Sequence, residues 1–297
     1  MNIINKILLN FNLQISKIQN GELSNDLFLR SINPDGSNSF FLRGGSNLYK
    51  NLISIGFSFR LDEYGNAIGE FNNIKMFVQS IEDLFILNEI YSEGTYNFSL
   101  PVKCVIIDIG MNVGFSSLFF SSSELVHKII SFEPVTTTFQ QGLKNFELNP
   151  ELKSKIEPYN YGIGGNTRQE EFIFSQEWKG SVGLRGLEES KAISSKKLES
   201  VKVQIQDIAD AILIAKSFKL PVVAKIDSEG AEYEIIERLD NLHIIELIDL
   251  YMIEWHDKGS QRLAETLQKA EFSTITFNPF IFKNVGMLYA YKYNLNN

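Results

Sequence analysis

An apolar run that ends in a glycine-containing turn constrains the fold of this chain more than any other feature. Residues 102–109 form a near-continuous apolar run, and Gly110-Met111-Asn112-Val113-Gly114 follows directly. A strand of this kind is covered on both faces, as in a parallel sheet. After the turn, Phe115, Leu118 and Phe119 lie on one face of a predicted helix. The pattern predicts a buried strand, a tight turn and a helix.

The same alternation continues to the end of the chain. A short strand at 172–174 is expected in an inserted hairpin, and 201–205 alternates as an exposed edge strand would. This spacing specifies a doubly wound α/β fold with parallel core strands. The other predicted strands are 128–132, 155–161, 222–226 and 249–255, the helices lie around 139–146, 208–215, 232–239 and 263–270, and a β pair of 272–277 with 287–293 closes the chain.

The first hundred residues have a different pattern. Short β-like runs at 53–61 and 74–78 are separated by the turn signal at 62–66, and apolar residues at helical spacing follow over 81–90. We therefore expect an N-terminal extension with short strands and a helix over 1–95, and one α/β domain over 96–297.

Composition limits the partners and the compartment. Of 297 residues, 28 are basic and 36 acidic, and the net charge of −8 disfavours a general nucleic-acid binder. No stretch approaches the roughly 18 uncharged apolar residues of a membrane span, and no cleavable signal pattern precedes residue 20. Cys104 is the single cysteine and cannot pair within the chain. We expect a cytoplasmic protein with no membrane span, and the sequence leaves its oligomeric state open.

Two acidic residues stand at the ends of the first two predicted strands of the domain. Asp108 precedes the glycine turn, and Glu133 ends the next strand. Ligands of such sheets bind at the carboxyl ends of the strands, where an acid after the second strand accepts hydrogen bonds from ribose hydroxyls. A dinucleotide fingerprint would have glycine in place of Asn112, and the chain has no phosphate-binding G-x-x-x-x-G-K-[ST] motif. The pattern favours a nucleoside with a cationic end, such as S-adenosylmethionine.

A second cluster of ionisable residues follows the fourth core strand. Lys225, Asp227 and Glu229 would share one face of an extended segment, and Glu254 and His256 end the next strand. Ionisable groups beside a buried strand are costly unless they are paired or functional, so we expect both clusters to line one crevice. Metal ligation is open as well, since hard carboxylates suit magnesium or calcium, but no spacing here requires a metal.

Several segments with these residues occur in a fixed order between residues 84 and 256. They are 105–114, 132–134, 161–165, 225–232 and 253–256, with a lead-in at 88–91 and 96–98. In this ordered set the sequence resembles the FkbM family of S-adenosylmethionine-dependent methyltransferases. The resemblance implies the class I (Rossmann-like) methyltransferase fold, a seven-stranded, mostly parallel sheet with an antiparallel last strand. It also implies methyl transfer, usually to a hydroxyl of a sugar, glycan or natural product.

Site roles follow from the resemblance together with the strand ends. The family commonly has alanine at Met111 and valine at Ser228, and the bulk of Met111 would narrow the donor site. We expect the donor to contact Asp108, Gly110, Asn112, Gly114 and Glu133, and its adenine to lie beside Tyr161 and Gly162.

A neutral hydroxyl acceptor must lose its proton during methyl transfer, so a base or a metal is needed. We expect His256 or Asp227 as the base, Glu229 and Glu254 as orienting or metal-binding groups, and Lys225 as an electrostatic partner.

Two other functions remain open from the sequence. One is a nicotinamide-dependent oxidoreductase on a related sheet, against which Asn112 in the turn argues. The other is a non-catalytic binding module on the same fold. Residues 175–200 lack periodicity and are either a surface loop or a lid over the acceptor, in which Trp178, Ser181 and Arg185 would make contacts.

Overall fold

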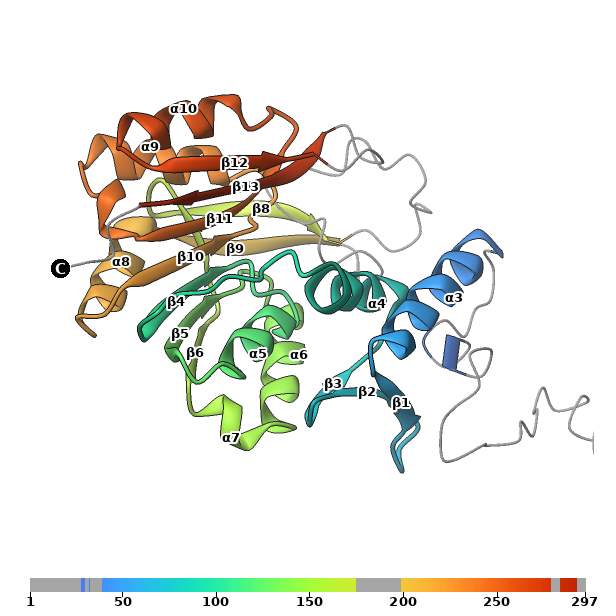
Figure 1. Ribbon diagram of the computed structural model, residues 1–297. Coiled ribbons are helices and arrows are strands. Elements are labelled where there is room, and N and C mark those ends of the chain that lie inside the picture. The colour runs from blue at the N-terminus through green and yellow to red at the C-terminus, as the bar shows by residue number, and fades with distance from the viewer. Residues whose placement is uncertain (1–27, 30–31, 33–38, 175–198, 279–283, 293–297) are drawn as a thin grey trace, which may run out of the picture. The chain divides into compact units, whose positions relative to one another are not determined.

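In the computed structural model the chain forms two compact units, Met1–Glu93 and Gly94–Asn297 (Figure 1). The structure describes residues 28–29, 32, 39–174, 199–278 and 284–292. The predicted lid residues Trp178, Ser181 and Arg185 lie outside the described residues, as does the start of the chain. No helix in the described ranges has the length and apolar character needed to cross a membrane.

A seven-stranded sheet forms the centre of the second unit. In chain order its strands are β4 (Cys104–Ile109), β5 (Val126–Phe132), β6 (Ile156–Tyr159), β10 (Val222–Ile226), β11 (Leu250–His256), β12 (Ser273–Phe277) and β13 (Val285–Tyr291). Their order across the sheet is β12-β13-β11-β10-β4-β5-β6. β13 is antiparallel to both of its neighbours, and the remaining pairs are parallel. This confirms the predicted class I arrangement with an antiparallel last strand.

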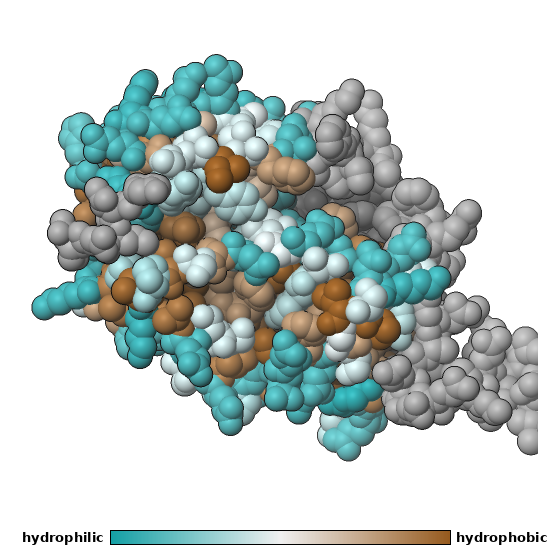
Figure 2. Space-filling model, in the orientation of Figure 1, coloured by the Kyte–Doolittle hydropathy of each residue, from teal (hydrophilic) through white to brown (hydrophobic). Residues whose placement is uncertain are grey.

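Helices cover both faces of this sheet (Figure 1). Alternate residues of β4, such as Ile107, enter a core shared with α8 (Ile208–Lys216), α9 (Glu232–Asn241) and α10 (Gln261–Lys269). Asp108 points to the opposite face, which α5 (Phe115–Ser121), α6 (Thr136–Glu147) and α7 (Pro150–Lys153) cover. The outer faces of α9 and α10 are hydrophilic, as the teal along the upper edge of Figure 2 shows. The sheet is therefore buried on both sides, as its apolar strands predict.

A second, three-stranded sheet lies beside the carboxyl ends of the core strands. It comprises β7 (Gly162–Gly164), β8 (Arg168–Phe174) and β9 (Glu199–Asp207), with β9 in the middle. The prediction that 201–205 is an edge strand was therefore wrong, because β9 pairs with β7 on one side and β8 on the other. Val203 and Ile205 are buried with Val135 and Phe172 in a small apolar cluster of their own.

The first unit contains a helix, a three-stranded antiparallel sheet and a second helix. Over residues 39–93 its elements are α3 (Ser39–Ser54), β1 (Ser58–Leu61), β2 (Ala67–Phe71), β3 (Ile74–Phe77), α4 (Ile81–Leu87) and the π-helix η1 (Asn88–Glu93). The strand predicted over 53–61 starts too early, because Ile53 belongs to α3 and Gly56, with φ 110°, ends that helix. The predicted turn does join β1 to β2, and Asp62 accepts hydrogen bonds from the backbone N–H groups of Tyr64 and Asn66.

Candidate active site

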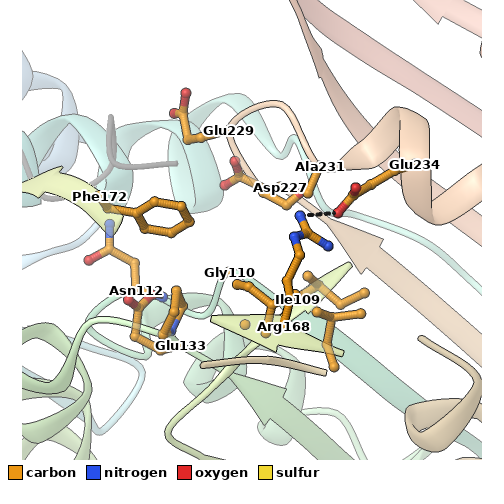
Figure 3. Close-up of a pocket in the computed structure, with 15 residues that line it drawn as sticks. Ile109, Gly110, Asn112, Glu133, Arg168, Phe172, Asp227, Glu229, Ala231 and Glu234 are labelled. Carbon is orange, nitrogen blue, oxygen red and sulfur yellow. Dashed lines mark hydrogen bonds and ion pairs between the residues drawn. The ribbon is translucent and has the colours of Figure 1, made fainter. Parts of the chain in front are cut away.

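A pocket opens at the carboxyl ends of β4, β5 and β10 (Figure 3). The empty space between its walls is about 640 Å³, which includes open solvent. Its walls come from the turn after β4, the end of β5, the three-stranded sheet, the loop after β10 and the start of α9. Figure 3 shows Asn112 and Glu133 across the pocket from Asp227 and Glu229. The two predicted clusters thus meet in one pocket, although only some of their residues line it.

The glycine turn brings backbone close to the pocket and to the loop after β10. Gly110 has φ 75°, and a Cβ added to it would lie 1.8 Å from the backbone oxygen of Asp227. Asn112 also lines the pocket, has φ 49°, and its buried Oδ1 has no hydrogen-bond partner in the described part of the chain. Gly114 does not line the pocket. A Cβ at this position would lie 2.5 Å from the ring of Phe146, so glycine is needed here for Phe146 to pack against the turn.

Glu133 is buried at the end of β5 and faces the pocket. Its Oε2 accepts a hydrogen bond from the backbone N–H of Asn112 at 3.1 Å, and its Oε1 accepts one from the N–H of Val135 at 2.9 Å. Burial raises the pKa of Glu133 to about 7, although these two N–H groups oppose the shift. Each carboxylate oxygen keeps a further lone pair that can accept a hydrogen bond from a ligand hydroxyl.

Asp108 and Lys225 form a buried ionic centre beneath the turn. They are register partners on β4 and β10, and Lys225 Nζ lies 3.5 Å from Asp108 Oδ1 and 3.4 Å from Asp227 Oδ2. The same ammonium donates hydrogen bonds to the carbonyl oxygens of Ile109, at 3.2 Å, and Gly110, at 2.5 Å. Burial lowers the pKa of Lys225, but the surrounding carboxylates outweigh burial and raise it. Neither side chain lines the pocket, so both hold the turn from behind.

The other face of Asp108 is also occupied. Its Oδ2 accepts hydrogen bonds from the hydroxyls of Ser116, at 2.8 Å, and Ser117, at 2.6 Å, and Ser117 is within 2.7 Å of the hydroxyl of Ser131. Asp108 is completely buried. Asp108 is therefore enclosed by protein groups and does not line the pocket.

The loop after β10 does not continue the strand as the sequence pattern suggested. β10 ends at Ile226, and Glu229 has φ 48°, in the left-handed region. Lys225 therefore points beneath the turn, whereas Asp227 and Glu229 line the pocket. The expectation that all three share one strand face was wrong beyond the end of β10.

His256 is buried at the end of β11 and surrounded by acids. Its Nδ1 lies 3.3 Å from Glu232 Oε1, and its Nε2 lies 3.6 Å from Glu229 Oε2 and 4.0 Å from Glu254 Oε1. Burial alone lowers the pKa of His256, but the hydrogen bond to Glu232 and the charges of Glu229, Glu232 and Asp227 raise it to about 9. The ring is therefore protonated near neutral pH.

An apolar wall completes the pocket on the side of the three-stranded sheet. Pro134, Gly162, Ile163, Phe172 and Ile205 contribute to it. An apolar wall of this kind suits a nucleobase.

Two further residues lie next to this wall, one that the sequence predicted at the site and one that it did not. Tyr161 packs on the core side, with its ring centroid 5.4 Å from that of Phe132, and does not line the pocket. Arg168 does line it, and its guanidinium donates to Glu170 at 2.6 Å and to Glu234 at 2.8 Å. Arg168 thereby fixes β8 to the start of α9.

Sequence reasoning missed the contribution of the three-stranded sheet to the pocket. Arg168 and Phe172 lie four residues apart on β8, so that they share one face, and Ile205 lies on the central strand. The alternating apolar pattern at 201–205 carried this signal, but it does not say which residues pair with it.

Comparison with known proteins identifies the family. The model of the methyltransferase FkbM domain matches residues 108–274. The chain belongs to this family. It is therefore a methyltransferase of the FkbM type, and the family implies S-adenosylmethionine as the methyl donor. This membership disagrees with the nicotinamide-dependent oxidoreductase that the sequence left open.

Two curated relatives are also named as methyltransferases. Methyltransferase 1 of Beauveria bassiana (strain ARSEF 2860) is 26% identical over 204 residues, 64% of this chain and 81% of the relative. Methyltransferase sdnD of Sordaria araneosa is 25% identical over 222 residues, 67% of this chain and 85% of the relative. The crystal structure of methyltransferase FkbM from Methylobacillus flagellatus KT has a TM-score of 0.44 at 13% identity, and the match covers 90% of this chain and 59% of that one.

The pocket fits the donor that the family implies. The buried, unpartnered Oδ1 of Asn112 and the free lone pairs of Glu133 are hydrogen-bond acceptors for hydroxyl or ammonium groups. The apolar wall suits the adenine, and the carboxylates of Asp227 and Glu229 suit the positively charged end of the molecule.

Proposed function

We propose that the protein transfers a methyl group from S-adenosylmethionine to a hydroxyl of a sugar, glycan or other natural product. The observation that carries this proposal is a pocket with different chemistry at its two ends. One end combines the buried acceptor Glu133 with apolar side chains, and the other presents the carboxylates of Asp227 and Glu229. The first end suits a nucleoside, and the second suits both a sulfonium and the removal of a hydroxyl proton.

S-adenosylmethionine supplies an electrophilic methyl group on a sulfonium. The protein's part is to hold the two reactants in line, because the acceptor O–C bond forms as the S–C bond breaks and a neutral thioether leaves. In this proposal Glu133 accepts the ribose hydroxyls, Gly110 allows the backbone to approach the ligand, and Phe172 and Ile205 cover the base. These groups also exclude water from one side of the pocket.

The hydroxyl proton needs an acceptor, and we assign it to the carboxylates at the pocket rim. Asp227 and Glu229 line the pocket, whereas His256 does not. Without a metal the ring of His256 is protonated near neutral pH, because its pKa is raised to about 9, so it has no lone pair for the acceptor proton. We therefore give His256 the role of orienting Glu229, and Lys225 that of holding Asp227.

Calorimetric titration of the full chain with S-adenosylhomocysteine tests the donor part of the proposal. Binding is expected in the wild type and a large loss of affinity in Glu133→Ala. Glu147→Ala is the matched control, because Glu147 is exposed and pairs with Lys153 on the surface. Unchanged affinity in Glu133→Ala would contradict the assignment.

A screen with labelled methyl donor tests the acceptor part. Sugars, polyketides, lipid-linked glycans and peptides are offered, and the product is analysed by mass spectrometry and by the chemical shift of the new methyl group. An O-methyl ether is expected. A methylated nitrogen or carbon would contradict O-methylation and leave the donor assignment intact, whereas donor binding without turnover on any acceptor would favour the non-catalytic module.

A further inference from the structure

Three side chains at the rim of the pocket bring potential metal ligands together. A carboxylate oxygen of Asp227, one of Glu229 and a ring nitrogen of His256 lie within 4.8 Å of one another. Ligands on one octahedral cation at about 2.1 Å are about 3 to 4 Å apart. The separation of 3.6 Å between His256 Nε2 and Glu229 Oε2 falls in this range.

The imidazole is already oriented for ligation. Glu232 is completely buried, and its Oε1 accepts a hydrogen bond from the backbone N–H of His256 at 2.8 Å and lies 3.3 Å from Nδ1. Its Oε2 accepts a hydrogen bond from the backbone N–H of Gly230 at 2.8 Å, which holds the carboxylate in place. Metal-binding histidines usually donate their second ring N–H to such a carboxylate. The ring, with only 2% of its side chain exposed, therefore directs Nε2 toward Glu229 and Glu254.

Nε2 has no hydrogen bond in the described ranges of the chain. The nearest carboxylate oxygen, Glu229 Oε2, is at 3.6 Å, outside hydrogen-bond distance for a well-formed N–H···O contact. Nε2 also lies 4.0 Å from Glu254 Oε1, so this buried ring nitrogen faces two carboxylates at ion-pair distances. A cation bound between them would take the place of the ring proton.

We propose that Asp227, Glu229 and His256 bind a divalent cation of the Mn²⁺ or Mg²⁺ type, with Glu232 as the residue that positions His256. Two carboxylates and one imidazole form a donor set for a hard to borderline cation, and the remaining coordination positions are left for water or substrate oxygen. Binding requires the neutral imidazole, so the ring proton leaves as the cation enters. A role for the cation in activating a hydroxyl acceptor rests on the proposed O-methylation; the binding site itself does not.

Electron paramagnetic resonance with Mn²⁺ tests the site directly. The full chain is freed of metal with a chelator and titrated with Mn²⁺, and the loss of the free-ion signal reports binding. One saturable site per chain is expected, with binding lost in Glu229→Gln and His256→Gln. Glu232→Gln should weaken binding about tenfold or more, because it loosens the ring that carries the ligand. Glu237→Gln is the matched control on the same helix, since Glu237 is exposed and pairs with Arg262.

Two results would overturn the proposal: no saturable Mn²⁺ site in the wild type, or unchanged affinity in both Glu229→Gln and His256→Gln. Thermal unfolding checks that the variants fold. If His256→Gln does not fold, Glu229→Gln decides, because Glu229 sits in a loop at the pocket rim. Titration with S-adenosylhomocysteine in chelator separates the two proposals: donor binding without Mn²⁺ binding removes the metal site and keeps the donor site, and the reverse removes the donor site alone.

Discussion

The pH dependence of donor binding is a sharp test of the role of Glu133. Burial raises the pKa of this carboxyl to about 7 in the ligand-free protein. A ribose hydroxyl donates its hydrogen to the ionised carboxylate, so only the ionised form is fully competent to bind. The ionised fraction is about one tenth at pH 6 and about nine tenths at pH 8, and apparent affinity scales with the competent fraction. Affinity for S-adenosylhomocysteine should therefore rise about tenfold between these pH values.

Isothermal titration calorimetry at pH 6, 7 and 8 measures this effect. Affinity should rise with pH because the pKa of Glu133 is raised. Below pH 7 the carboxyl is mostly protonated, and the ligand can bind fully only after this proton is lost. Glu133→Gln removes the titrating group but keeps its shape, so its affinity should be lower and nearly independent of pH. An affinity in the wild type that is flat over this range, or that falls with rising pH, would refute the reasoning. A pH dependence that persists in Glu133→Gln would assign it to another group.

Three further predictions concern stability. Gly110→Ala should destabilise the fold by several kcal/mol more than Gly259→Ala, measured by urea unfolding, because both glycines have positive φ but only the new Cβ at Gly110 meets a backbone oxygen, at 1.8 Å. Lys225→Met should cost about 3 to 5 kcal/mol by leaving buried Asp108 without its cation, and adding Asp108→Asn should recover part of this loss; an additive second loss would contradict the pairing. In chelator, the free energy of unfolding should fall by about 3 kcal/mol as the pH rises from 6.5 through 9, because the pKa of His256 is raised in the folded state. His256→Asn should flatten that profile, and an unchanged slope would exclude the assignment.

The core of the fold could be predicted because its signals are local. The apolar run of β4, its glycine turn and the helix after it follow from periodicity and turn chemistry over fewer than twenty residues. Register then brings Asp108 beside Lys225, since the two strands are parallel neighbours. These residues were expected at the site, and the sequence could not show that their side chains lie behind the turn and do not line the pocket.

The errors came from features that depend on distant partners or on the ends of elements. The pattern of β9 fits an edge strand or a half-buried central strand equally well, and only its pairing with β7 and β8 decides. Ile53 has an apolar, β-branched side chain that suits a strand, but the helix of α3 extends through it. The alternation that grouped Glu229 with Lys225 assumes an extended backbone, and the chain leaves that conformation after Ile226.

The contacts of one ammonium group restrict how this enzyme can diversify. Lys225 Nζ donates hydrogen bonds to the carbonyl oxygens of Ile109, at the end of β4, and Gly110, in the turn that we assign to the donor. It also forms an ion pair with Asp227, in the loop that we assign to the acceptor. Lys225 thereby connects the turn after β4 with the loop after β10, so a backbone shift in one of these segments should also displace the other. New acceptor preferences should therefore be easier to evolve or engineer at positions that do not contact this shared ammonium group.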